Sequence, residues 1–146
     1  MKHPALRIAL AVATLALGCW AALAQAQPRS LTGIRQNIET SLRLQGQAIE
    51  TLGDPDGALR LTWDAYVHLR AAHGDMTINA SAAKFPDPVF PLTNERVEQA
   101  RLHILAARDA LRDRARWSGT GNPIDVARDQ LTEAIHLTRI ILATTF

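Results

Sequence analysis

Apolar residues recur at steps of three, four and seven along most of this chain, and no other feature limits its fold as strongly. Residues spaced in this way share one side of an α-helix, so the pattern predicts amphipathic helices over 31–52, 55–74, 93–117 and 123–141. Because the alternation typical of strands is not supported, we expect an all-α fold. The apolar stripes are Leu31, Ile34, Ile38, Leu42, Ile49 and Leu52; Leu59, Trp63, Tyr66 and Leu69, with Ala58, Ala65 and Ala72 beside them; Val97, Ala100, Ile104, Ala107 and Leu111; and Ile124, Ala127, Leu131, Ile135, Thr138 and Ile141.

The residues between these segments are those that end and restart helices. Gly53 can end the first helix in the left-handed conformation, and Gly74 is the expected end of the second. Asp54-Pro55 and Asn122-Pro123 each pair a capping side chain with a proline whose missing N–H costs nothing in the first turn. Thr93 is the expected N-cap of the third helix.

The connection between the second and third helices is long and contains three prolines. Residues 75–92 include Pro86, Pro88 and Pro91, which the interior of a regular helix does not accommodate. The other two connections are short and require antiparallel neighbours. We therefore predict an antiparallel four-helix bundle built from two helical hairpins joined by a long Pro-rich loop. Tetratricopeptide-type repeats are the alternative, but the two halves share only the Asp/Asn-Pro helix start, which is a capping device.

The N-terminal segment has the order of a secretory signal peptide. A basic end precedes an uncharged run over 8–24, and Ala24-Gln25-Ala26 places small residues where a signal peptidase cuts. Cleavage after Ala26 divides the chain into a signal peptide, 1–26, and a four-helix bundle domain, 27–146. The alternatives are lipidation at Cys19 and an uncleaved anchor, although the run falls short of the about 20 residues of a spanning helix. With cleavage, we expect a periplasmic or secreted protein without a stable membrane anchor.

The same cleavage changes the charge of the domain and removes the cysteine. The whole chain has 16 basic and 14 acidic residues, and the loss of Lys2 and Arg7 leaves 14 of each. Nucleic-acid binding needs a basic face on the domain itself, so no nucleic-acid partner is expected. Because Cys19 is also lost, no disulfide can staple the remaining residues, and an apolar core has to hold them together.

Histidines on three different helices raise the possibility of a metal site. His68, His103 and His136 lie on the second, third and fourth helices, and Glu133-x-x-His136 puts two possible ligands on one helix face. Di-iron bundles use that motif twice, whereas it occurs here once, and histidines beside the apolar stripes are equally explained as surface residues. A metal- or haem-binding bundle that uses Glu133, His136, His103 and His68 is therefore the alternative function, with the cofactor left open.

The segment between the hairpins is the more informative candidate for binding. Phe85, Val89 and Phe90 stand among its prolines, and proline lowers the entropy that a segment loses when it docks. A loop that plugs the end of the core explains the same residues. Trp117 closes an arginine-rich turn in which an arginine can stack on its ring. Since no catalytic constellation is found, we expect a non-enzymatic exported protein that binds a protein partner or small ligand through the loop and the bundle ends.

Overall fold

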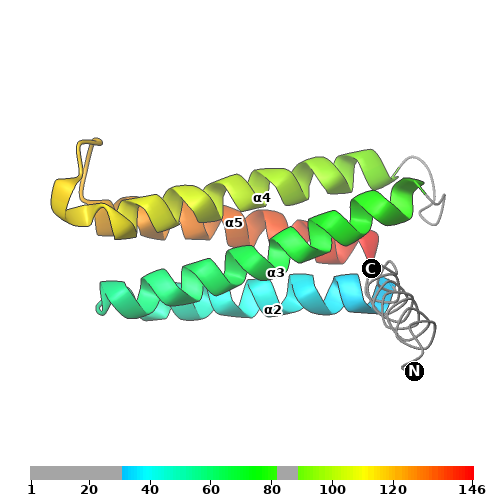
Figure 1. The fold of residues 1–146 in the computed structure, drawn as a ribbon, viewed down its shortest axis with the longest axis horizontal. Coiled ribbons are helices and arrows are strands. Elements are labelled where there is room, and N and C mark those ends of the chain that lie inside the picture. The colour runs from blue at the N-terminus through cyan, green and yellow to red at the C-terminus, as the bar shows by residue number, and fades with distance from the viewer. Residues whose placement is uncertain (1–30, 82–88) are drawn as a thin grey trace, which may run out of the picture.

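A computed structural model of the protein describes residues 31–81 and 89–146, and within them the chain is helical without strands (Figure 1). The predicted all-α fold is thus confirmed. The predicted signal peptide, 1–26, lies outside the described residues. The helices are α2 (Leu31–Glu50), α3 (Pro55–Ser81), α4 (Val89–Arg112) and α5 (Pro123–Thr145), with a short 3-10 helix, η1 (Arg114–Arg116), after α4.

The four α-helices form a bundle in which each packs against two neighbours. The pairs are α2 with α3, α3 with α4, α4 with α5, and α5 with α2. Helices joined by a short turn run antiparallel to each other, as Figure 1 shows for α2 with α3 and for α4 with α5. The predicted bundle of two helical hairpins is therefore confirmed. None of the helices in the described part of the chain combines the length and the apolar composition of a membrane-spanning segment.

The core is rich in alanine, which allows the helices to approach closely. The predicted stripe of α4 is correct at every position, because all five of its residues are fully buried. On α3 the buried line runs through Ala58, Ala65 and Ala72, the alanines that the sequence placed beside the stripe. The largest fully buried apolar side chains are Ile34, Ile38, Leu69, Met76, Ile104, Leu111, Leu131, Ile141 and Val97.

A polar network crosses the middle of this core. The hydroxyl of Ser41 donates to the carbonyl of Ala65 at 2.7 Å, and the hydroxyl of Thr138 donates to the carbonyl of Ala134, also at 2.7 Å. Gln45 Nε2 donates to both hydroxyl oxygens, at 3.0 Å to Ser41 and 3.3 Å to Thr138. The network joins α2 to α3 and α5, while Gln45 Oε1 is buried with no hydrogen-bond partner among the described residues.

The structure corrects the predicted connection between the two hairpins. Helix α3 continues through Gly74 to Ser81, and α4 begins at Val89, so only 82–88 separate them, and these residues lie outside the described ranges. A glycine inside a helix costs about 1 kcal/mol, but Met76, one half-turn further on, is fully buried in the core. Pro91 stands in the first turn of α4, where a proline is tolerated.

The helix boundaries confirm one predicted cap and correct two others. Asn122 caps α5, because its side-chain oxygen accepts a hydrogen bond from the amide of Ile124 at 2.9 Å. Thr93 is not an N-cap. It lies inside α4, buried, with its hydroxyl 2.8 Å from the hydroxyl of Thr145. The left-handed glycine of the described residues is Gly121, with φ 82°, rather than the predicted Gly53.

Candidate functional site

Trp63 lies on the outer side of α3 and has 44% of its surface exposed. The sequence predicted it as part of the core stripe. That prediction is wrong for Trp63, although Tyr66 and Leu69 of the same stripe are buried together with the alanine line of α3. Its ring stacks on Tyr66, with the centroids 5.3 Å apart and an angle of 27° between the planes. The heptad spacing of Ala58, Ala65 and Ala72 was the signal that could have located the buried face correctly.

An arginine from the neighbouring helix covers the indole ring of Trp63. The guanidinium carbon of Arg108, on α4, lies 5.3 Å from the ring centroid, a cation–π distance. Its Nε and Nη2 both donate to Asp109 Oδ1, at 3.0 and 2.7 Å. The arginine–tryptophan stack that the sequence suggested at Trp117 is thus formed by Trp63.

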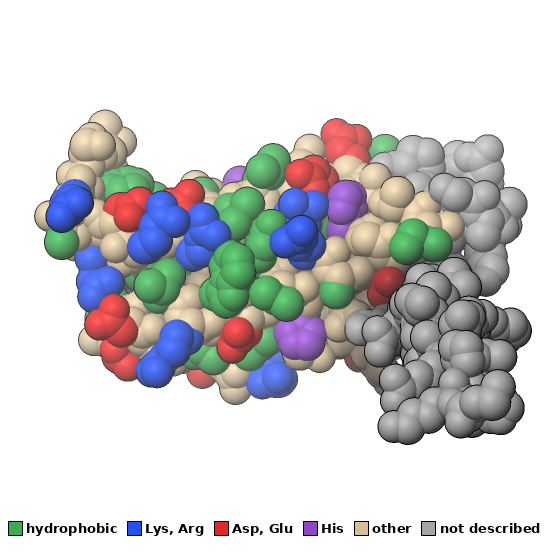
Figure 2. All heavy atoms as spheres, viewed as in Figure 1, with side chains coloured by type: hydrophobic (Ala, Val, Ile, Leu, Met, Phe, Trp, Pro, Cys, Tyr) green, Lys and Arg blue, Asp and Glu red, His purple; other side chains and the backbone are tan. Residues whose placement is uncertain are grey.

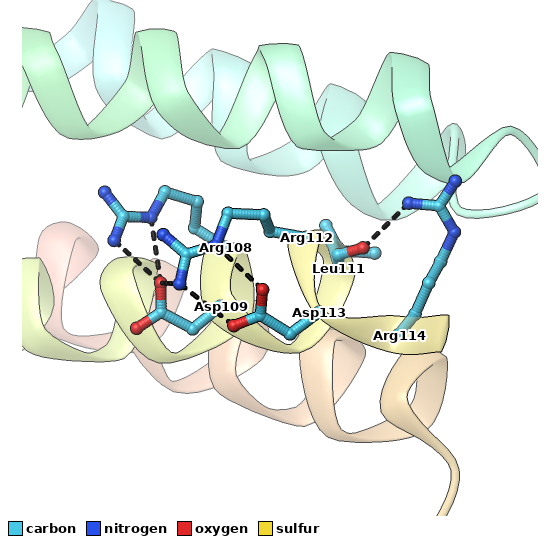
Figure 3. Close-up of polar contacts among 6 residues, drawn as sticks. All are labelled: Arg108, Asp109, Leu111, Arg112, Asp113 and Arg114. Carbon is cyan, nitrogen blue, oxygen red and sulfur yellow. Dashed lines mark hydrogen bonds and ion pairs between the residues drawn. The ribbon is translucent and has the colours of Figure 1, made fainter. Parts of the chain in front are cut away.

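The pairing continues along α4 as a short ladder of alternating charges (Figure 3). Arg112 lies 3.5 Å from Asp109 and donates from Nε and Nη2 to the two carboxylate oxygens of Asp113, at 3.0 and 2.9 Å. The hydrogen bond from Arg112 lowers the pKa of Asp113 and raises the pKa of Arg112 itself. Arg114 binds the carbonyl of Leu111 at 2.8 Å and pairs with Asp56 of α3 at 2.9 Å. Arg108, Arg112 and Arg114 are thus each held by an ion pair with a carboxylate, and the carboxylate that holds Arg114 belongs to α3.

A surface hollow of about 500 Å³ opens between α3 and α4 at this point. Two of its charged residues, Arg60 and Asp64, form no hydrogen bond or ion pair with another described residue. Hydrophobic side chains gather over α3 and α4 on this side of the molecule, with basic side chains beside them (Figure 2). The residues that line the hollow are Leu59, Arg60, Trp63, Asp64, Arg108 and Arg112.

A polar cluster of Arg101, Glu98 and His73 adjoins Tyr66, the ring on which Trp63 stacks. Arg101 lies over the Tyr66 ring at 5.6 Å and pairs with Glu98 at 2.7 Å. The same guanidinium Nη1 lies 3.1 Å from Nδ1 of His73, which can accept its hydrogen bond when that nitrogen carries no proton. Burial and the positive charge of Arg101 lower the pKa of His73, against a smaller opposing effect of Glu98.

The candidate metal ligands remain apart. His68 Nδ1 lies 3.0 Å from Asn37 Oδ1, and His103 Nδ1 lies 2.7 Å from Gln130 Oε1, so each has a side-chain amide partner. His136 and Glu133 are exposed on α5. Across 31–81 and 89–146, no three or more His, Cys, Asp or Glu side chains are grouped so that they can hold a metal ion.

The structure describes only some of the other predicted contact residues. Phe85 lies outside the described residues, and Val89 and Phe90 begin α4 but their side chains are not described. Trp117 is partly buried against the core near Leu111, and a side chain at Gly119 would overlap its ring. Among the described residues, its indole nitrogen is buried without an acceptor.

Comparison of the chain with protein-family models, with curated proteins and with solved structures finds no match. Its function therefore has to be inferred from its own surface.

Proposed function

We propose that this protein is an exported, non-enzymatic binding protein that contacts a protein partner through the outer side of α3 and α4. We call this surface the Trp63 face and define it as Leu59, Arg60, Trp63, Asp64, Val67, Arg108 and Arg112. The observation that carries the proposal is that Trp63 is 44% exposed and yet fixed in place by Tyr66 and Arg108. Export is supported by the sequence of residues 1–26.

The composition of the Trp63 face favours a protein partner. Tryptophan, tyrosine and arginine are the residues most enriched among those that dominate binding energy at protein interfaces. Trp63 and Arg108 are already held by ring stacking, a cation–π contact and an ion pair, so little side-chain freedom is lost when a partner binds. Val67, 45% exposed one turn along α3, extends the apolar part of the surface.

The hollow beside Trp63 gives a partner side chain a place to enter. Its lining combines the apolar surfaces of Leu59 and Trp63 with the charged groups of Arg60, Arg108 and Arg112. An apolar side chain flanked by one acidic and one basic group is complementary to that lining, because Arg108 and Arg112 are already paired with Asp109 and Asp113, which leaves Arg60 and Asp64 for a partner. The non-enzymatic part of the proposal rests on the sequence, in which no catalytic constellation is found.

A photo-crosslinking amino acid at position 67 tests the proposal in the cell that exports the protein. We expect an adduct with a defined partner band, and we expect Trp63→Ala to abolish that band while the variant keeps its helical circular dichroism. Position 139, exposed on α5, is the matched control site for the crosslinker. An adduct yield at 67 no higher than at 139, or a band that Trp63→Ala leaves unchanged, would overturn the proposal.

A further inference from the structure

Helix α3 is apolar on two opposite sides. Its inner side carries the alanine line, Leu69 and Met76, all fully buried in the bundle. Its outer side carries Trp63, Val67 and Ile78, which are 44%, 45% and 49% exposed. Val67 follows Trp63 by four positions and Ile78 follows Val67 by eleven, so the three residues lie on one stripe of the helix. Because α2 and α4 pack on its flanks, no helix of the described bundle covers this outer stripe, although the Arg108 side chain of α4 lies over the ring of Trp63.

Two opposite charges lie beside this stripe on α3. Arg60 and Asp64 are one turn apart on the exposed side of α3, and neither is bonded to the other or to another described residue. By contrast, Arg108 and Arg112 nearby are paired with Asp109 and Asp113. The exposed charges of Arg60 and Asp64 are therefore available to complementary charges of a partner.

We propose that the partner of the Trp63 face is a second copy of this chain, whose α3 packs antiparallel on the outer side of the first α3. The inference rests on the proposed function, because it names the partner of the same surface. In a two-fold pair, each residue contact occurs twice with the roles exchanged. A two-fold axis level with residue 62 places Arg60 of each copy beside Asp64 of the other, so the two charges pair reciprocally. Residues 55–69 of the two α3 helices then overlap, and this overlap includes Trp63 and Val67 but not Ile78.

The shape of the surface fits the same arrangement. The outer ridge of α3 has the 500 Å³ hollow on its α4 side, lined by Trp63, and a 220 Å³ hollow on its α2 side, lined by Val67. A ridge between two grooves can pack against a copy of itself, as ridges pack into grooves between helices. The charge of residues 27–146 also permits it, because equal numbers of basic and acidic residues give little long-range repulsion between copies.

Sedimentation equilibrium of the exported chain, purified from the producing cell, tests the inference. We expect a monomer–dimer equilibrium that Arg60→Asp or Asp64→Arg alone weakens by about tenfold or more, because each creates two like-charge contacts across the axis. The double variant R60D/D64R exchanges the charges and should restore dimerisation. Arg139→Asp, a reversal on the exposed side of α5, should leave the equilibrium unchanged.

The outcomes separate this inference from the proposed function. A chain that stays monomeric at every soluble concentration, or a dimer that ignores both single reversals, would overturn the second copy as partner. If position 67 then crosslinks to a different protein in a Trp63-dependent manner, the Trp63 face remains the contact surface and only the identity of the partner is wrong. Failure of the proposed function is the separate result in which position 67 gives no adduct above the control site.

Discussion

Arg108 lies over the ring of Trp63 at 5.3 Å while its Nε and Nη2 bind a single oxygen of Asp109. The ion pair fixes the guanidinium plane, and the guanidinium in turn covers an indole that would otherwise be still more exposed. An aromatic side chain that is partly exposed and held on two sides presents a rigid apolar surface. This relationship supports the proposed contact surface on α3 and α4.

Replacing Arg108 by alanine should weaken the fold slightly and uncover the indole. The contacts with Trp63 and Asp109 are partly exposed, so their combined loss should lower the free energy of unfolding by about 1 kcal/mol. Urea unfolding, together with a red shift of tryptophan emission in the folded state, measures both effects. Arg139→Ala, at an exposed position on α5, is the control. Equal behaviour of the two variants would show that Arg108 does not hold the ring.

The buried side chain of Gln45 should be replaceable by methionine without loss of stability. Ser41 and Thr138 keep their bonds to backbone carbonyls when the amide is removed, and the orphaned Oε1 disappears with it. An unsatisfied buried polar group costs about 1–3 kcal/mol. We therefore expect Gln45→Met to unfold at the same or a higher urea concentration than the unaltered protein.

Gln45→Ala provides the contrast, because it leaves a cavity where methionine fills the space. Its free energy of unfolding should fall about 2–3 kcal/mol below that of Gln45→Met. If the two variants were equally destabilised, the amide bonds to Ser41 and Thr138 would contribute more than the orphaned oxygen costs.

Stability should decrease on the acid side of neutrality because of His73. Its pKa in the folded protein lies below the ordinary value of 6.5, so below that pH the unfolded chain binds a proton that the folded chain does not. The stability that neutral His73 contributes is fully present above pH 6.5 and is lost as the pH falls through the lowered pKa of the folded protein. Urea unfolding at about pH 7.5 and about pH 5.5 measures the loss.

His73→Gln should reduce this pH dependence, since a glutamine oxygen can still accept from Arg101 but does not titrate. His136→Gln, on the exposed side of α5, controls for the removal of a histidine as such. If the free energy of unfolding depended on pH equally in the unaltered protein and in His73→Gln, the assignment of this pH dependence to His73 would be contradicted.

Two adjacent alanines on α4 test the packing of the core. Ala107 is fully buried and Ala106 is exposed. Ala107→Leu should lower the free energy of unfolding by about 1–3 kcal/mol through overpacking, whereas Ala106→Leu should change it by less than about 0.5 kcal/mol. Thermal unfolding distinguishes them. Similar melting temperatures for the two variants would mean that α4 is rotated relative to the described bundle.

Much of the fold follows from periodicity and capping in the sequence. The stripe of α4 is correct throughout because its buried residues follow the helical period without interruption, and the Asn122 cap acts within two residues. The end of α3 was not predictable in this way. Gly74 reads locally as a helix end, but the burial of Met76 comes from contacts that are distant in the chain and favours continuing the helix.

The candidate site was harder to predict, because helical spacing tells which residues share a side and not which side faces inward. Trp63 is apolar and in phase with Leu59 and Tyr66, yet it is 44% exposed, whereas Tyr66 and the alanine line are buried. The polar residues Ser41 and Gln45 are likewise buried on α2, where the spacing of apolar residues gives no signal for them. The exposure of Trp63 and the burial of Ser41 and Gln45 are both decided by how the helices pack on one another, and not by the spacing of residues within one helix.

Oxidative footprinting of Trp63 in the compartment where the protein works tests the central claim most directly. In the purified chain at high dilution, its half-exposed indole should oxidise readily, whereas the partly buried Trp117 should oxidise less. In the native compartment, binding at the Trp63 face should protect Trp63 and leave the oxidation of Trp117 unchanged. Equal oxidation of Trp63 in both settings would show that nothing covers this face and would contradict the account.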